Sequence, residues 1–441
     1  MRPWLIPASY VTVATVCAFV LPRLEYAYLG DLTLKMSVSS AQAVLSAAAS
    51  GMMALTAIVF AVAFVVVQFS AVSYSPRVVL MFARDRTLFH TLGIFAATFI
   101  YCLWTLAWVD RAGTGNVPML SVLLVAVLVI VSMMLFAGLV QRLNELQINN
   151  VLYAIGDSGR EVIRTTFQPF DDRRHNRGAE GADRPDKAFP ESRPQILRYS
   201  GPPRTITSFD VGGFVGQAQK AQCLIVTTCA VGDTLVEGTI LLEVQGAKAA
   251  LPEDELLAAI HLAKERTFEQ DPKYPIRLLV DIAIRALSPA INDPTTAVQT
   301  IDQIEDLLRR LGQSDLAVGQ VRDASGTLRL VYNVPTWEDY LALAFDEIRQ
   351  YGDDSVQVMR RLRSALVSVA ESVTDKERVD VVTRYLEHLD LTIDRSSFDQ
   401  EDRTVARQED RQGIGLSRKR AGSATSSVLS KANATPEGAP K

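Results

Sequence analysis

The chain has 441 residues, a formal net charge of -4 and four cysteines. This length is enough for two or three domains. The charge gives no indication of a nucleic-acid partner, and four cysteines are too few for a disulfide framework. Nearly all of the uncharged apolar sequence precedes Val140, and nearly all of the charge follows it. The composition therefore predicts an α-helical membrane protein with a water-soluble C-terminal part.

Four apolar segments approach the ~20 residues that a helix needs to cross a bilayer. They cover residues 4–21, 44–69, 88–109 and 118–140, and none contains a charged residue in its interior. The first segment follows Arg2, as in a secretory signal, but it does not end in a small-x-small cleavage pattern. We expect an uncleaved anchor and a four-helix transmembrane domain at 1–140.

Basic residues lie unevenly on the two sides of these spans. One side would contain Arg2, Arg77, Arg84, Arg86 and Arg142, and the other Arg23, Lys35 and Arg111. Because Lys and Arg favour the cytoplasmic side, both termini are expected in the cytoplasm of a bacterial cell, with the spans in its inner membrane. Residues 73–86, between spans two and three, are expected to form a short interfacial helix.

Span two has small residues at every fourth position, a spacing that lets helix backbones approach closely in lipid. The members of this face are Ala43, Ala47, Gly51, Ser46, Ser50 and Ala54. We expect the face to pack inside the bundle or between subunits of a homo-oligomer. The alternative is a pore lined by Ser46, Ser50 and Thr56. No acid lies inside the four segments, which argues against a proton-coupled carrier.

After the spans, residues 141–170 keep apolar residues at helical spacing and are expected to continue span four as a stalk, with a weak point at the "GDSG" of 156–159. Residues 171–195 read as a charged linker. Residues 196–250 are rich in β-formers and turn glycines, which predicts a small β-sandwich or half-barrel. Cys223 and Cys229 are expected in its core.

Residues 251–395 show repeated amphipathic helical patterns. They predict a helical bundle, so that the cytoplasmic part as a whole would be an α+β domain. From residue 396 to residue 441 the sequence is polar and of low complexity, which predicts a disordered tail.

The segment "RALSPAINDPTTA" at 285–297 separates two helical patterns. Asp293 is placed as an N-cap before a proline at the first helical position, and the preceding helix has polar residues at i, i+4 and i+8. We expect the break to fold back and complete a buried polar cluster, whose members are Arg266, Asp271, Arg277, Asp281, Arg285, Asn292, Asp293, Thr295 and Thr296. Its role is either structural, setting the angle between two helices, or that of a site for a partner or a small anion at the second helix's N-terminus.

Several long motifs resemble one bacterial family of predicted membrane proteins, domain of unknown function 2254. They are "RTFEQDPKYPIRLLVDIAIRALSPAINDPTTAVQTIDQIEDLLRRL" (266–311), "SPRVVLMFARDR", "WEDYLALAFDEIRQYG" and "DRQGIG". The resemblance implies an integral membrane protein with a cytoplasmic domain, and it implies no established activity. Family members have a paired histidine after the fourth span, where this chain reads "LNELQINNVLYAIG", so no histidine role is transferred.

Catalysis is not expected. His90, His175, His261 and His388 lie in unrelated segments, and the sequence contains no P-loop, dinucleotide-binding or kinase signature. We therefore expect no catalytic residues, no metal ligands and no cofactor. The favoured function is an oligomeric channel or transport-like protein controlled by its cytoplasmic domain. The alternative is a membrane-anchored regulatory or scaffold protein whose cytoplasmic domain binds a small ligand or a protein partner.

The uneven basic residues predict the topology. A reporter fused after Gly113 should be active outside the cytoplasm, and one fused after Asn150 should be active inside it, because the larger group of basic residues stays in the cytoplasm. The comparison uses paired alkaline phosphatase and fluorescent-protein fusions. The opposite pattern would show that the chain is inserted the other way round.

Overall fold

The computed structural model describes residues 4–28, 36–73, 86–111, 117–145, 148–170 and 193–415. Their contacts divide the chain into two compact units, Met1–Ala154 and Ile155–Lys441. Each unit has hydrophobic clusters of its own. Most of the expected interfacial helix at 73–86, most of the charged linker and the last part of the tail lie outside the described residues.

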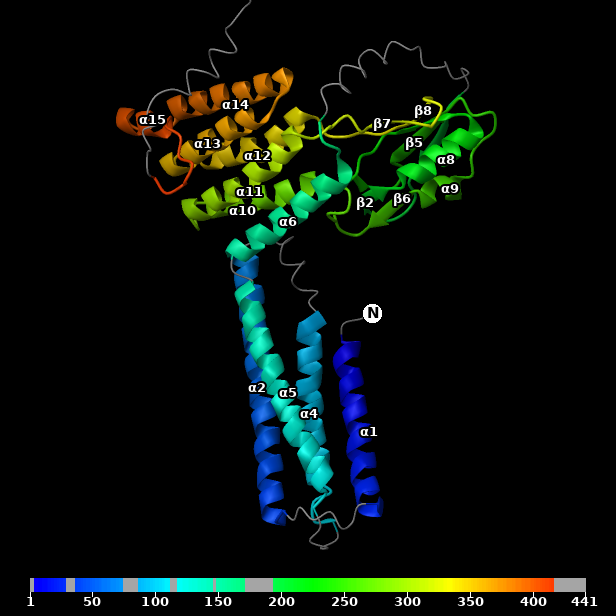
Figure 1. Cartoon of the computed structure of the whole chain (residues 1–441), viewed down its shortest axis with the longest axis vertical. Coiled ribbons are helices and arrows are strands. Elements are labelled where there is room, and N and C mark those ends of the chain that lie inside the picture. The colour runs from blue at the N-terminus through cyan, green and yellow to red at the C-terminus, as the bar shows by residue number, and fades with distance from the viewer. Residues whose placement is uncertain are drawn as a thin grey trace, which may run out of the picture. The chain divides into compact units, whose positions relative to one another are not determined.

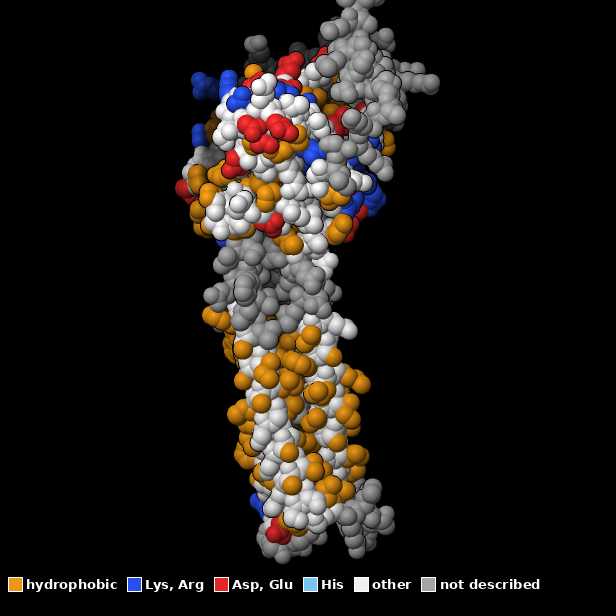
Figure 2. Space-filling view, turned by 90° about the vertical axis from the view of Figure 1, so that its left-hand side faces the viewer, with side chains coloured by type: hydrophobic (Ala, Val, Ile, Leu, Met, Phe, Trp, Pro, Cys, Tyr) orange, Lys and Arg blue, Asp and Glu red, His pale blue; other side chains and the backbone are white. Residues whose placement is uncertain are grey.

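Long helices form the first unit (Figure 1): α1 (Leu5–Tyr28), α2 (Val38–Ser73), α4 (Arg86–Leu106) and α5 (Met119–Glu145). Each contains a stretch long and apolar enough to cross a membrane, over Leu5–Tyr28, Val38–Ala61, Leu88–Leu106 and Met119–Gln141. Apolar side chains are spread over the visible face of this unit, as expected of a lipid-facing bundle (Figure 2). The prediction of four apolar helices, each long enough to span a membrane, is confirmed.

Helix α4 packs against α1, α2 and α5. It lies close to α1 at Gly93, where a Cβ atom would stand 2.6 Å from the Tyr10 ring and 3.2 Å from the Pro7 Cα. Ala14 and Ala18 of α1 and Ala97 of α4 are buried in the same cluster. Small residues therefore bring these two helices together, as is usual in membranes.

The small-residue face of α2 does not pack inside the bundle. Its members Ser46, Ala47, Ser50, Gly51 and Ala54 are all exposed, and a Cβ atom on Gly51 would meet nothing within 4 Å. The buried face of α2 consists of other residues, Ala41, Leu45, Ala49, Met52 and Val59. Packing within one chain was therefore the wrong interpretation of this face. Packing between subunits, or a pore formed by several chains, stays a prediction.

Helix α1 is longer than the first apolar segment, because it continues through Pro22 to Tyr28. This extension places Glu25 inside a candidate span, with only 6% of its surface exposed. Its carboxylate accepts hydrogen bonds from the backbone N–H of Leu120, at 2.8 Å, and of Ser121, at 3.3 Å, at the start of α5. The expectation that the spans contain no acid is therefore corrected.

Helix α6 (Ile148–Thr166) begins three residues after the last residue of α5 and includes the boundary between the two units in the sequence. The "GDSG" segment is helical and is not a weak point. A Cβ atom on Gly156 would stand 2.2 Å from the Gln303 side chain, and one on Gly159 would stand 2.8 Å from Leu307. The two glycines therefore allow α6 to pack closely on α11 (Pro294–Gly312).

The second unit contains eight short strands among the described residues. They are β1 (Gln195–Arg198), β2 (Arg204–Phe209), β3 (Leu224–Thr227), β4 (Thr234–Leu235), β5 (Ile240–Gln245), β6 (Ile260–Ala263), β7 (Gln320–Arg322) and β8 (Leu328–Val331). One sheet has the order β1-β5-β3-β8-β7 and the other the order β4-β2-β6. Only the β3–β8 pair is parallel among the pairs formed by these strands.

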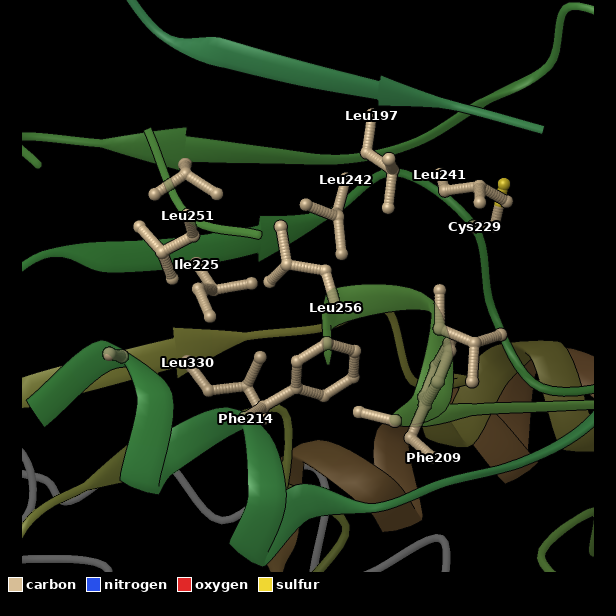
Figure 3. Close-up of a cluster of buried hydrophobic side chains, with 14 of the residues drawn as sticks. Leu197, Phe209, Phe214, Ile225, Cys229, Leu241, Leu242, Leu251, Leu256 and Leu330 are labelled. Atoms are coloured by element: carbon tan, nitrogen blue, oxygen red, sulfur yellow. The ribbon is translucent and has the colours of Figure 1, made fainter. Parts of the chain in front are cut away.

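The sheets share a hydrophobic core with two helices, α8 (Val211–Ala221) and α9 (Glu253–Ala258). Figure 3 shows side chains such as Phe214, Ile225, Leu242 and Leu330 pointing toward one another in this core. Cys223 and Cys229 belong to the same core, as expected. However, β6, β7 and β8 come from residues 251–395, so the β-rich part extends beyond 196–250 and the later segment is not purely helical.

The helical side of this unit is formed by α10 (Lys273–Ala286), α11, α12 (Trp337–Tyr351), α13 (Val356–Ser372) and α14 (Lys376–Arg395). In Figure 1 these helices gather away from the sheets. The α+β character of the region after the spans is confirmed.

The beginning of the expected disordered tail is folded. Helix α15 (Gln400–Ala406) and the following segment reach Gly415. The buried Asp410 carboxylate accepts N–H bonds from Gly413 at 3.0 Å and from Gly415 at 2.7 Å. The Gln357 amide of α13 donates to the Gly413 carbonyl at 2.6 Å. Disorder from residue 396 was therefore the wrong prediction for 396–415, and 416–441 lie outside the described residues.

The Gly413→Ala substitution should loosen this segment. Gly413 has a φ of +66°, and an added Cβ would stand 2.3 Å from the Val298 side chain. A left-handed non-glycine residue alone costs roughly 1–2 kcal/mol, so trypsin should cleave after Arg407 and Arg411 about tenfold faster. Gly216→Ala is the control, because Gly216 lies in α8 with nothing within 4 Å of its Cβ position. Equal cleavage rates in wild type and Gly413→Ala would contradict the importance of this turn.

Candidate functional site

The break between α10 and α11 is satisfied locally. The Asp293 carboxylate accepts the Thr296 N–H at 3.1 Å and the Thr296 hydroxyl at 2.6 Å, which confirms Asp293 as the N-cap of α11. Asn292 has a positive φ of 48° and is exposed, and Thr295 is exposed as well. The expected single polar cluster is therefore wrong, because the polar groups of the break serve the turn and the cap. The Asp293 carboxylate also occupies the helix N-terminus that was considered for an anion.

The stripe on α10 pairs with α12 instead. Arg277 donates from Nε to Asp281 at 2.7 Å, and its two terminal nitrogens donate to Glu347 at 2.6 and 2.8 Å. The exposed fraction is 18% for both Arg277 and Asp281. A bidentate pair of this kind has a defined geometry. It links α10 to α12. Arg285, the third member of the stripe, is half-buried.

A second part of the expected cluster lies in the loop before α10. Arg266 Nε stands 3.2 Å from Asp271 Oδ2, and Asp271 is 2% exposed. A Cβ atom on Gly232 would stand 2.2 Å from the Arg266 guanidinium and 2.4 Å from Asp271 Oδ2. The turn at Gly232, with a φ of +91°, therefore has to lack a side chain so that this pair can be buried against it.

A cavity of about 300 Å³ adjoins Asp271. Stretches of the second unit that contribute to its walls include the end of α6, the turn after β3, the loop before α10, and the start of α12 with the loop that precedes it. Among the lining residues are Thr166, Phe167, Ala230, Val231, Asp271, Lys273, Val334 and Tyr340. The volume falls at the lower end of the range for small-ligand sites.

Two polar side chains of this lining are almost completely buried. The Tyr340 hydroxyl has no hydrogen-bond partner among the described residues, and Tyr340 is 0% exposed. Asp271 Oδ2 is within ion-pair distance of Arg266, but the two atoms do not meet hydrogen-bond geometry. Asp271 Oδ1 accepts the backbone N–H of Lys273 at 3.2 Å. Buried polar atoms without hydrogen bonds are rare and often mark a functional site.

Lys273 provides the basic group among the described lining residues. Its ammonium donates to the Val231 carbonyl at 3.0 Å. An ammonium has three N–H donors, so this one bond leaves donor capacity at a half-buried position. Arg266 and Lys273 together place two positive charges next to the one buried carboxylate of Asp271.

Burial controls the protonation of two lining residues. Desolvation raises the pKa of Asp271, and the nearby Arg266 and Lys273 oppose this effect. Desolvation also raises the pKa of Tyr340, and the negative charge of Asp271 raises it further. Tyr340 is therefore a neutral hydroxyl at physiological pH, able both to donate and to accept a hydrogen bond.

Several of these residues were not singled out from the sequence. Thr166, Lys273 and Tyr340 come from three segments that lie far apart in the sequence. No local spacing therefore joins them. Gly232 is one of the turn glycines in the β-rich segment 196–250. Its contact with Arg266 and Asp271 depends on the tertiary fold. Among the described residues, no three His, Cys, Asp or Glu side chains are grouped so that they could hold a metal ion.

The raised pKa of Asp271 predicts a pH-dependent difference between wild type and Asp271→Asn. Because the folded pKa lies above the unfolded value of about 3.9, burial of the ionised form costs stability at neutral pH. This cost disappears as the pH falls through the folded pKa. The melting temperature of wild type relative to Asp271→Asn should therefore rise as the pH is lowered from neutral to about pH 4, the usual range of an aspartate pKa. A constant or falling difference would contradict the raised pKa.

Comparisons with known proteins identify relatives of the whole chain. A family model described as "Predicted membrane protein (DUF2254)" matches residues 2–368. An uncharacterized protein of Mycobacterium tuberculosis is 27% identical over 418 residues, covering 91% of this chain and 78% of its own. An uncharacterized protein of Mycobacterium bovis matches with the same identity and coverage. No solved structure matches. The match ends before the "DRQGIG" segment, so the resemblance there stays untested.

Proposed function

The chain belongs to the family of predicted membrane proteins that its residues 2–368 match, and we propose that it is a membrane-anchored receptor for a small organic acid. The observation that supports this proposal is the cavity beside Asp271, with the Lys273 ammonium in its wall. The proposal corresponds to the regulatory alternative of the sequence analysis. It has the α+β unit on the cytoplasmic side of a bacterial inner membrane, as the Lys and Arg distribution favours.

The charges in the cavity wall favour an anion. Arg266 lies 3.2 Å from the buried Asp271 carboxylate. The charges of these two side chains cancel, so the pair adds no net charge to the site. Lys273 then leaves one uncompensated positive charge, while Glu269 at the rim is exposed to solvent. A carboxylate on the ligand would accept hydrogen bonds from the ammonium, and the pairing would be strengthened by charge.

The remaining walls favour a ligand with an apolar body. Phe167, Val231 and Val334 contribute apolar surface to the lining. Pockets of this kind bind mainly through apolar contact, with a few polar groups that fix the orientation. A short aliphatic or aromatic carboxylic acid has both parts. The cavity also includes Thr166 at the end of α6, the helix that follows span four in the chain. Ligand binding would therefore act on the segment that leads directly to the membrane.

The test measures the melting temperature of the full chain in detergent with hexanoate or benzoate. Hexanol and benzyl alcohol are the uncharged controls. A ligand that binds only the folded state at a hundredfold excess over its Kd adds about 2.7 kcal/mol of stability. We expect the acids, and not the alcohols, to raise the melting temperature of wild type.

Variants locate the effect. Lys273→Met should abolish the acid-dependent rise, and Ala230→Phe, which fills the cavity, should abolish it too. Lys220→Met, on the exposed end of α8, should retain it. If no acid stabilises wild type, or if Lys273→Met responds as wild type does, the receptor proposal is wrong.

A further inference from the structure

One face of α4 inside the bundle is lined with hydroxyl groups. Thr91, Thr98 and Thr105 follow at intervals of seven residues and are each 0% exposed. Seven residues are close to two helical turns, so the three side chains share one face, separated by about 10 Å along the axis. Since α4 contacts the three other spans, this face lies in the interior of a single chain's bundle.

Helix α5 contributes hydroxyl groups to the same interior. Ser121 and Ser132 are 0% exposed, and the Ser132 hydroxyl stands 3.3 Å from that of Thr98. The Tyr101 hydroxyl of α4 lies near Thr105 and Ser121. Tyr101 is 1% exposed, yet neither its hydroxyl nor that of Thr105 makes a geometrically acceptable hydrogen bond with a described residue. In a bilayer there is no bulk solvent to satisfy such groups.

A titratable side chain stands at each end of this row. Glu25 lies beside Ser121, whose hydroxyl is 3.4 Å from the carboxylate. At the other end of α4, His90 precedes Thr91 in the chain, and its Nδ1 stands 3.1 Å from the Tyr10 hydroxyl of α1. Glutamate and histidine side chains inside membrane proteins often belong to proton relays.

A purely structural role explains only part of this arrangement. The Thr98–Ser132 contact can hold α4 to α5, and Glu25 caps the first N–H groups of α5. Polar contacts of this kind are common between membrane helices. The Tyr101 and Thr105 hydroxyls make no geometrically acceptable hydrogen bond with a described residue, and phenylalanine and valine would fill the same space without a buried hydroxyl. Their hydroxyl groups therefore call for another explanation.

We propose that the interior of the four-helix bundle conducts protons between His90 and Glu25. A proton arriving on the His90 ring would pass along the row of hydroxyls, with water molecules bridging the wider intervals. Each oxygen accepts one proton and releases another, so only O–H and N–H bonds form and break. The proton leaves from the Glu25 carboxylate, and the pH difference across the membrane drives the movement. This proposal is independent of the ligand cavity.

The test reconstitutes the full chain into liposomes that enclose a pH-sensitive dye. A potassium gradient with valinomycin supplies the driving potential. Wild type should acidify the interior at least tenfold faster than protein-free liposomes. Tyr101→Phe and Thr98→Val, which keep the side-chain volume, should each lower the rate at least fivefold, and Glu25→Gln should lower it further.

Ser50→Ala is the matched control, since Ser50 lies on the exposed face of α2. It should conduct as wild type does. Gel filtration and melting temperature show whether each variant folds. If Glu25→Gln does not fold, Tyr101→Phe decides the outcome. A wild-type rate equal to that of empty liposomes overturns the proposal. So does an unchanged rate in Tyr101→Phe, or a rate lost in Ser50→Ala, which would move the path to the face between subunits.

Discussion

The Asp271 carboxylate joins parts of the α+β unit that are far apart in the sequence. One oxygen accepts the N–H of Lys273 at the start of α10, and the other faces Arg266 at 3.2 Å. Arg266 and Asp271 fit against the turn at Gly232 only because that residue has no side chain. Breaking a buried pair by removing one partner typically costs 3–5 kcal/mol. The shape of the cavity depends on this contact, because Val231 and Lys273 both line the cavity wall. Val231 directly precedes Gly232, and Lys273 follows Asp271 by two residues.

Much of the fold could be predicted from patterns that repeat over many residues. The four spans follow from apolar length, and Asp293 as the cap of α11 and Thr336 as that of α12 follow from local sequence. Short elements could not be predicted in this way. Strands β6 and β8 have four residues each, too few for an alternating pattern to be distinguished from a helix. The segment at 396–415 looks polar, but its order depends on Asp410 and on contacts from α13.

The candidate sites show the same difference between local and distant contacts. The pairing of Arg277 with Asp281 follows from their spacing of four residues, whereas Glu347, seventy residues later, could be found only in the fold. In the membrane-spanning unit, by contrast, the spacing that matters is local. The spacing of seven residues between Thr91, Thr98 and Thr105 is visible in the sequence, but the small residues of span two are the more prominent pattern, and in one chain they lie on an exposed face. Glu25 lies beyond the apolar segment 4–21 that the sequence predicts, because α1 continues through Pro22 to Tyr28.

The central position of α4 also bears on how the bundle is made. Helices α1 and α2 enter the membrane first as the chain is synthesised, yet both pack on α4, which comes third. Until it arrives, the surface of α1 at Pro7 and Tyr10, against which Gly93 packs, and the buried face of α2 have only lipid as a neighbour. In lipid, helix association relies on packing and on contacts between polar groups. Biosynthesis therefore delays the assembly of the first two spans, and a ribosome stalled before residue 86 holds a pair of helices that still lack their shared partner.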